Sequence, residues 1–307
     1  MPLHMLTSLT IGVPDVGAAR VYYREFGLAD AGGGWLATRD GGRQLRFETA
    51  PFRRLLAMEM AVDDPDDIAR ISSRLDAIDV VAERDASSVT APEPVTGVHV
   101  TARVTPRLTQ APVPAPVYNG PGAPARAGTR APAILRSGRV VPRRLGHVVI
   151  GSPDPGVSQR FFTDGFGLEV SDQVRDAASF MRCSTDHHNV LVQRAPVTFL
   201  HHTSWQVDDV DEVGRGATAM LEGHPERHVW GLGRHHIGSN FFWYLRDPAG
   251  TFAEYCSDLD CVVDDELWDA RVWEEDKGLY RWGPPPPPSF VNPEDLAARM
   301  TGAHTAG

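Results

Sequence analysis

The sequence predicts an α+β protein built from tandem βαβββ modules, with two modules in each half of the 307-residue chain. Residues 6–28 (LTSLTIGVPDVGAARVYYREFGL) match residues 145–168 (LGHVVIGSPDPGVSQRFFTDGFGL) with one inserted residue. A second pair, residues 55–71 and 200–216, shares a strand that ends in Val-Asp-Asp. Internal repetition of this kind indicates a duplicated structural unit.

Each repeated segment of the first kind reads as a strand, a Pro-Asp turn and an amphipathic helix that ends before a glycine. In the first of these helices Ala18, Val21 and Tyr22 lie about one turn apart and are expected to face the core. Gly27 and Gly167 are expected to cap the C-terminal ends of their helices. The aspartates of each Val-Asp-Asp are natural N-caps for the helix that follows.

These patterns predict four segments along the chain. Residues 1–103 form an N-terminal domain, 104–142 a Pro/Ala-rich linker, 143–260 a C-terminal domain, and 261–307 a Trp/Pro-rich tail. Because the linker is rich in proline, it cannot donate enough backbone hydrogen bonds to join a sheet. We expect it to run extended over a domain surface. The tryptophans of the tail predict that it docks, with a neighbouring subunit as one candidate surface.

Composition excludes several classes of protein. The net charge of −10 argues against nucleic acid or an anionic membrane as a partner. No apolar stretch approaches the roughly 20 residues that span a bilayer, and the N-terminus lacks the pattern of a signal peptide. The three cysteines have spacings of neither a zinc site nor a disulfide framework. We therefore expect a cytoplasmic protein in a reducing environment.

Three residues form a candidate metal site. His147, His202 and Glu254 fall at corresponding strand positions of the two C-terminal modules. Two imidazoles and one carboxylate can occupy one face of an octahedral metal and leave three positions open, as in non-haem Fe(II) enzymes. Nine of the twelve histidines also fall between His147 and His236. The competing interpretation is that each histidine is an ordinary core residue and that Glu254 faces solvent.

The choice of His202 over its neighbour His201 follows from strand geometry. Successive side chains of a strand point to opposite faces, so both cannot bind one ion. His202 shares parity with the polar residues Ser204 and Gln206. The N-terminal half provides an internal control, because the repeat alignment places three residues without ligand chemistry of this kind at the corresponding positions: Ser8, Ala57 and Thr101.

A predicted hairpin brings a phenol to the same face as the carboxylate. Pro248-Ala249-Gly250 suits a three-residue hairpin loop, with glycine in the left-handed position. A hairpin centred on Ala249 sets Tyr244 across from Glu254. A loop one residue longer would place the two side chains on opposite faces.

Taken together, the motifs GHVVIGSPD, DHHNVLV, LHHTSWQVDDVDEV and GRHHIGSNFFWYLRDPAGTFAEY resemble the vicinal oxygen chelate superfamily. Within it, they resemble the two-domain type I extradiol catechol dioxygenases. The resemblance implies a metal-free N-terminal domain and a catalytic C-terminal domain. It places the metal ligands on His147, His202 and Glu254, and the acid–base residues on His188, His235 and Tyr244. Within the pairs His187–His188 and His235–His236, the assignment rests on the family pattern.

The resemblance also implies a reaction and its partners. A catechol, for example a 2,3-dihydroxybiphenyl-like compound, would receive both atoms of O₂ at a non-haem Fe(II) centre, and Mn(II) fits the same ligands. His235 and Tyr244 would bind the catechol oxygens, and His188 would act as the general acid. A homo-oligomer is expected by analogy with the family.

Two other functions remain open on the sequence. The superfamily includes isomerases, epimerases and antibiotic-inactivating transferases that use a similar divalent metal site. It also includes metal-free proteins that bind small molecules. The three acid–base residues disfavour the first class, and the complete ligand triad disfavours the second.

Overall fold

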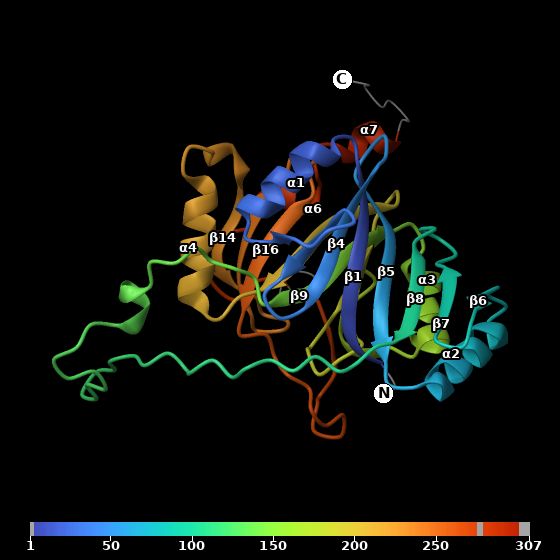
Figure 1. The fold of residues 1–307 in the computed structure, drawn as a ribbon, viewed down its shortest axis with the longest axis horizontal. Helices are drawn as coiled ribbons and strands as arrows, with labels where there is room; N and C mark the ends of the chain where they lie inside the picture. Colours follow the sequence, from blue (N-terminus) through green and yellow to red (C-terminus); the bar gives the residue numbers. More distant parts are fainter. Residues whose placement is uncertain (1–2, 275–278, 301–307) are drawn as a thin grey trace.

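The protein, described here from a computed structural model over residues 3–274 and 279–300, contains two mixed β-sheets flanked by helices (Figure 1). Within these residues the first sheet has eight strands and the second has nine. The α+β fold with two tandem modules in each half is confirmed.

The first sheet consists of two βαβββ modules joined side by side. Its strands are β1 (Leu3–Val13), β2 (Ala29–Asp30), β3 (Trp35–Thr38), β4 (Gly42–Thr49), β5 (Arg54–Val62), β6 (Glu83–Arg84), β7 (Ser88–Pro92) and β8 (His99–Val104). Helix α1 (Val16–Glu25) follows β1, and α2 (Pro65–Ala77) follows β5. The strand order β2-β3-β4-β1-β5-β8-β7-β6 places the antiparallel pair β1–β5 at the junction of the modules.

The second sheet repeats this arrangement. Its strands are β9 (Arg144–Ser152), β10 (Glu169–Val174), β11 (Ala178–Arg182), β12 (Val190–Arg194), β13 (Phe199–Gln206), β14 (His228–Arg234), β15 (Phe241–Arg246), β16 (Phe252–Ser257) and β17 (Arg271–Trp273). The order is β14-β15-β16-β13-β9-β12-β11-β10-β17. Helix α3 (Pro155–Arg160) continues into the π-helical turn η2 (Phe161–Phe166), and α4 (Val210–Leu221) follows β13. Strand β17 comes from the tail and extends the edge beside β10.

The predicted helix caps are present. Asp64 and Asp209 accept backbone N–H groups at the starts of α2 and α4. Gly167 ends η2 in the left-handed conformation, with φ of 83°. The predicted inner face of α1 is partly wrong, because Val21 is 45% exposed. The buried residues of the helix are instead Ala19, Tyr22 and Tyr23.

The linker and the tail behave differently. The linker runs away from both sheets and returns, with one 3₁₀ turn, η1 (Pro132–Leu135) (Figure 1). The tail packs on the second sheet of its own chain, where Trp268 Nε1 donates a hydrogen bond to the Ser171 carbonyl. Further along, the tail forms two short helices, α6 (Pro288–Val291) and α7 (Leu296–Met300). None of the helices in the described residues has the length and apolar character to span a membrane.

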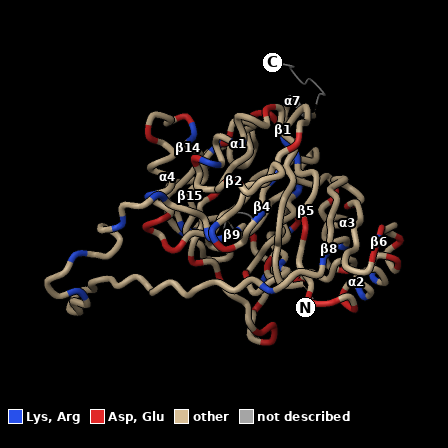
Figure 2. Tube along the Cα trace, in the orientation of Figure 1, with Lys and Arg blue, Asp and Glu red and all other residues tan. Residues whose placement is uncertain are grey.

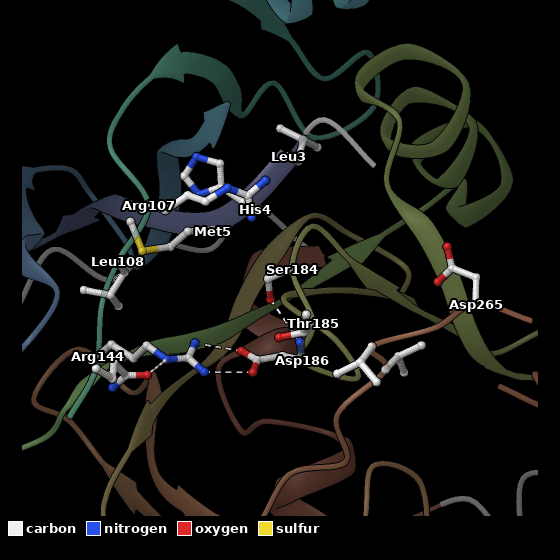
Figure 3. Close-up of a pocket in the computed structure, with 13 residues that line it drawn as sticks. Leu3, His4, Met5, Arg107, Leu108, Arg144, Ser184, Thr185, Asp186 and Asp265 are labelled. Atoms are coloured by element: carbon white, nitrogen blue, oxygen red, sulfur yellow. Dashed lines mark hydrogen bonds and ion pairs between the residues drawn. The ribbon is translucent and has the colours of Figure 1, made fainter. Parts of the chain in front are cut away.

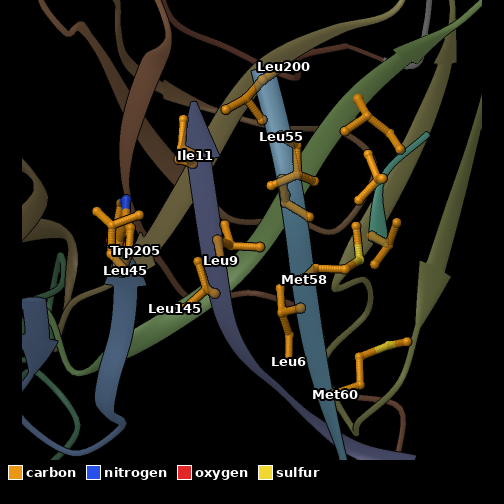
Figure 4. Close-up of a cluster of buried hydrophobic side chains, with 14 of the residues drawn as sticks. Leu6, Leu9, Ile11, Leu45, Leu55, Met58, Met60, Leu145, Leu200 and Trp205 are labelled. Carbon is orange, nitrogen blue, oxygen red and sulfur yellow. The ribbon is translucent and has the colours of Figure 1, made fainter. Parts of the chain in front are cut away.

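A single hydrophobic cluster connects the two sheets. Figure 4 shows Leu9 and Leu45 of the first sheet beside Leu145 and Trp205 of the second. Burial of apolar surface on this scale is the main stabilising contribution to a fold. Because the core is continuous, the division into domains at residues 103, 142 and 260 stays a prediction.

One contact ties the first module directly to the last. The ring of Phe26, after α1, stacks on Tyr255 of β16 with centroids 3.8 Å apart and an interplanar angle of 4°. The Tyr255 hydroxyl also donates a hydrogen bond to the Phe26 carbonyl at 2.5 Å. Since Glu254 precedes Tyr255, this contact helps to hold the strand that carries a candidate ligand.

Replacing Phe26 by alanine should therefore destabilise the protein. Removing a fully buried aromatic side chain leaves a cavity and typically costs about 3–5 kcal/mol. Urea denaturation of the Phe26→Ala variant should show this loss. Val21→Ala on the same helix is the matched control and should change the unfolding free energy by less than about 0.5 kcal/mol. Equal effects of the two substitutions would contradict this account of the interface.

Candidate metal centre

Neighbouring strands of the second sheet bring the three candidate ligands together. His147 lies on β9, His202 on β13 and Glu254 on β16, and β13 pairs with both other strands. The ligand atoms of these three residues all lie within 4.8 Å of one another. His147 Nε2 is 3.2 Å from His202 Nε2 and 3.1 Å from Glu254 Oε2. The sequence prediction that these side chains converge is therefore met by the geometry.

The environment of Glu254 suits a cation. The residue has no exposed surface, and its Oε2 accepts no hydrogen bond from the described residues. Its Oε1 accepts one hydrogen bond, from Asn240 Nδ2 at 3.1 Å. A buried carboxylate is costly unless a positive charge compensates it. A divalent metal between Oε2 and the two imidazole nitrogens would provide that charge, so the residues fit a metal.

The N-terminal sheet confirms the alignment of the repeats. Ser204 pairs with His147 and Glu254, and Glu59 pairs in the same way with Ser8 and Thr101. The first sheet thus has the same backbone register with Ser8 and Thr101 at two of the three ligand positions. The ligand triad is therefore not a requirement of the fold.

The predicted hairpin register is also confirmed. Tyr244 lies directly across from Glu254 in the β15–β16 pair. The loop closes through a hydrogen bond from the Asp247 N–H to the Thr251 carbonyl, and Gly250 has φ of 86°. A positive φ of this kind favours glycine, which explains why the loop ends there. Tyr244 consequently shares the cavity of the metal site.

A cavity of about 70 Å³ adjoins the triad and contains the three predicted acid–base residues, His188, His235 and Tyr244. The Tyr244 hydroxyl lies 2.8 Å from His235 Nε2, and the His188 ring lies 4.2 Å from that of His147. Apolar side chains complete the wall of the cavity. They are Val149, Phe180, Leu191, Ile237, Leu279 and Phe290.

Burial dominates the acid–base properties of these groups. It lowers the pKa of His188 well below its usual range, and the nearby His147 adds to this effect. Burial likewise raises the pKa of the Tyr244 phenol, with a further contribution from the charge of Glu254. Desolvation penalises the charged form in both cases. The site therefore favours neutral His188 and neutral Tyr244 at pH 7 in the absence of a metal.

The expectation that successive side chains of β13 point to opposite faces is wrong at His201. The strand has a bulge between Leu200 and His202, so His201 has no partner on β9 and its ring reaches the same cavity. A bulge inserts an extra residue and changes the direction of its side chain. His201 Nδ1 lies 2.7 Å from His202 Nδ1, and burial lowers the pKa of His201 to about 4. His201 therefore contacts the candidate ligand His202 through its Nδ1 atom.

Other residues at the site were not found from the sequence. His187 Nε2 lies 3.2 Å from Asp172 Oδ2, and His187 Nδ1 lies 3.0 Å from His188 Nδ1. The paired histidines were visible as a motif, but no local signal pointed to Asp172, which lies on another strand. Asn240 and the two tail residues of the cavity wall were missed for the same reason.

A larger cavity of about 390 Å³ lies elsewhere, between β1, the start of the linker and the loop before β12 (Figure 3). Two of its charged groups already bind each other, since Arg144 makes a bidentate ion pair with Asp186. Another, Arg107, pairs with Asp63. The cavity beside the triad is much smaller, but it holds the unpaired carboxylate oxygen and the convergent imidazoles.

Comparison with known proteins agrees with this location. The family model described as "Glyoxalase/Bleomycin resistance protein/Dioxygenase superfamily" matches residues 144–255. The chain is 39% identical over 175 residues to metapyrocatechase 2 of Cupriavidus necator, covering 55% of this chain and 53% of that protein. It is 27% identical over 156 residues to the manganese-dependent 2,3-dihydroxybiphenyl 1,2-dioxygenase of Geobacillus genomosp. 3, covering 47% and 50%. The match thus spans about half the length of these relatives.

A solved structure resembles nearly the whole chain. The Mn(II)-bound glyoxalase from Novosphingobium aromaticivorans superimposes with a TM-score of 0.75 at 23% identity and covers 94% of both chains. At this level of identity the likeness concerns the fold.

Substitution of a ligand should remove the metal. His202→Ala and Glu254→Gln should each abolish stoichiometric binding of a divalent ion, because two remaining ligands cannot complete the face. Inductively coupled plasma mass spectrometry after anaerobic loading and desalting measures the bound metal. His224→Ala, at an exposed histidine, is the control and should retain full metal content. Full occupancy in the Glu254→Gln variant would contradict the ligand assignment.

Proposed function

We propose that the protein is an extradiol dioxygenase that cleaves a substituted catechol at a non-haem Fe(II) site, because residues 144–255 match the family model described as "Glyoxalase/Bleomycin resistance protein/Dioxygenase superfamily". The observation that carries the proposal is the buried triad with three acid–base residues around one cavity. The relatives reported above support it, since one is named a metapyrocatechase and the other a 2,3-dihydroxybiphenyl 1,2-dioxygenase.

The proposed ligands are His147, His202 and Glu254. A bound Fe(II) ion would supply open positions for the catechol oxygens and the redox chemistry by which O₂ reacts with the ring. Mn(II) accepts the same ligands, and a relative of this chain is named as manganese-dependent. In the reaction both oxygen atoms enter the product while one ring carbon–carbon bond breaks, so no external reductant is required.

His235 and Tyr244 are proposed to bind the substrate hydroxyl groups. The two side chains already hydrogen-bond to each other at 2.8 Å, on the face that carries Glu254. An imidazole with a free lone pair can take the proton of a catechol hydroxyl, and the Tyr244 hydroxyl can donate to the resulting oxygen. The apolar walls, including Phe180 and Ile237, would enclose the ring and exclude water.

His188 is proposed as the general acid. Its Nδ1 contacts His187, which in turn contacts the carboxylate of Asp172. A carboxylate at the end of this chain can balance a positive charge on His187, which would place a proton on His188 Nε2. The backbone N–H of Arg271 in β17 donates to the other oxygen of Asp172 at 2.7 Å and holds it in place.

An isomerase of the same superfamily is the alternative function. Such an enzyme would use a similar divalent metal site, which the same triad could provide. The hydrogen-bonded pair of His235 and Tyr244 favours the dioxygenase, because a catechol has two hydroxyl groups to bind. A metal-free binding protein is disfavoured by the buried carboxylate oxygen of Glu254, which lacks a hydrogen bond within the described part of the chain.

The activity can be tested with iron-loaded protein. Oxygen uptake and the visible absorbance of a ring-opened product should both appear with a panel of substituted catechols. His188→Ala should lower kcat by about 10²–10⁴-fold, the usual contribution of an acid–base residue. It should keep its iron, because His188 is not a ligand. Absence of oxygen uptake with every catechol by the fully iron-loaded protein would contradict the dioxygenase, and isomerisation of a thiol adduct of an α-ketoaldehyde would favour the alternative.

We also propose that the protein forms a homo-oligomer through the linker and acts in the reducing cytoplasm, where its free cysteines and a ferrous site would stay reduced. The linker exposes apolar side chains: Val117, Tyr118, Ile134 and Leu135. Its charged residues are all arginines, whereas the chain's 40 acidic residues lie outside it (Figure 2). A basic arm with exposed apolar groups complements the acidic surface of a second copy.

Substitution in the arm should then change the oligomeric state. Ile134→Ser combined with Leu135→Ser should shift the protein toward the monomer in size-exclusion chromatography with light scattering. Val81→Ser, at an exposed valine outside the linker, should leave the mass unchanged. A wild-type protein that is monomeric throughout the micromolar range would contradict the proposed assembly.

A further inference from the structure

The C-terminal tail closes the cavity of the candidate metal centre. Leu279 and Phe290 lie in its wall, and the Phe290 ring packs on Tyr244 and His201 with centroids 4.7 and 4.8 Å apart. These contacts place two backbone carbonyl groups of the tail next to histidine rings.

Two anchors fix the tail in this position. Trp230 Nε1 donates a hydrogen bond to the Pro284 carbonyl at 2.7 Å. Arg53, from the first half of the chain, binds both carboxylate oxygens of Asp295 at 2.8 and 2.9 Å and donates to the Leu200 carbonyl at 2.7 Å. The buried guanidinium of Arg53 thereby connects the tail to the strand that carries His202.

The first carbonyl determines the tautomer of His235. His235 Nδ1 lies 2.5 Å from the carbonyl oxygen of Leu279. A carbonyl oxygen can only accept, so Nδ1 must carry the proton of the neutral ring. His235 Nε2 then has a free lone pair, which accepts the Tyr244 hydroxyl proton at 2.8 Å.

The second carbonyl acts on His202 through His201. His201 Nε2 lies 2.7 Å from the Phe290 carbonyl oxygen and must donate to it. In neutral His201, Nδ1 is then an acceptor, so the His202 Nδ1 at 2.7 Å must donate. His202 Nε2 is left with a lone pair, and this is the atom that faces His147 Nε2 at 3.2 Å.

We propose that the backbone carbonyls of Leu279 and Phe290 are positioning groups of the metal centre, which fix His235 and, through His201, His202 in the tautomer with unprotonated Nε2. The inference rests on the metal site of the proposed function and adds the tail as a structural part of it. An outer partner of this kind sets both the orientation of a metal-binding imidazole and the nitrogen that is free to bind.

Histidine tautomers can be measured directly in the full-length, metal-free protein. Long-range ¹⁵N–¹H spectra of [¹⁵N]histidine-labelled protein should show Nδ1–H tautomers for His202 and His235 and the Nε2–H tautomer for His201. Each histidine signal is assigned from the spectrum of a variant in which that one histidine is replaced. An Nε2–H tautomer at His202 or at His235 would overturn the inference, whatever the enzyme activity.

Two matched substitutions at His201 separate positioning from packing. His201→Leu fills the space but cannot accept the His202 Nδ1–H, and it should weaken Mn²⁺ binding in calorimetric titration by about 10–100-fold. His201→Asn fills the space less well but places an amide oxygen near the position of Nδ1, so it should retain affinity within a few-fold of wild type. Weaker binding by the asparagine variant than by the leucine variant would overturn the positioning role. Failure of the wild-type protein to bind Mn²⁺ or Fe²⁺ would instead overturn the proposed function, while the tautomer spectra test the hydrogen-bond chain independently.

Discussion

The buried carboxylate of Glu254 is the constraint on which the rest of the site depends. An ionised group without exposure to water is unstable unless a cation lies beside it. The described residues place two imidazoles next to its unpaired oxygen, and Asn240 satisfies the other oxygen. A divalent metal held by this oxygen and the two imidazole nitrogens would supply the compensating positive charge.

Adjacent strands give the triad its geometry, and the first half of the chain keeps those strands in place. The N-terminal modules share the backbone register of the C-terminal modules but carry Ser8 and Thr101 at the ligand positions. Their contribution is packing. Phe26 stacks on the residue after Glu254, and Arg53 binds the tail that covers the cavity. A copy of the fold without these ligand residues thus supports the copy that carries the triad.

Pairs of neighbouring histidines recur around the cavity and have a common physical role. In two of these pairs the Nδ1 atoms face each other, at 2.7 Å for His201–His202 and 3.0 Å for His187–His188. The outer ring connects to a carbonyl in the first pair and to a carboxylate in the second. A carbonyl fixes one proton arrangement, which suits a metal ligand. A carboxylate also tolerates a charged imidazole, which suits a residue that transfers a proton.

The sequence by itself determined the modular fold and the helix caps, because both follow from local patterns repeated at fixed spacing. It also predicted the three triad positions, because the first repeat lacks these residues at the corresponding places. The hairpin register of Tyr244 was also predictable, since a short loop with one left-handed glycine allows few alternatives. Three features were decided only by tertiary structure: the bulge at His201, the approach of Asp172 to His187, and the return of Leu279 and Phe290 to the cavity. A bulge depends on the pairing of two strands, and the other contacts join residues far apart in the chain. No local pattern encodes them, because packing energy, rather than spacing, selects these neighbours.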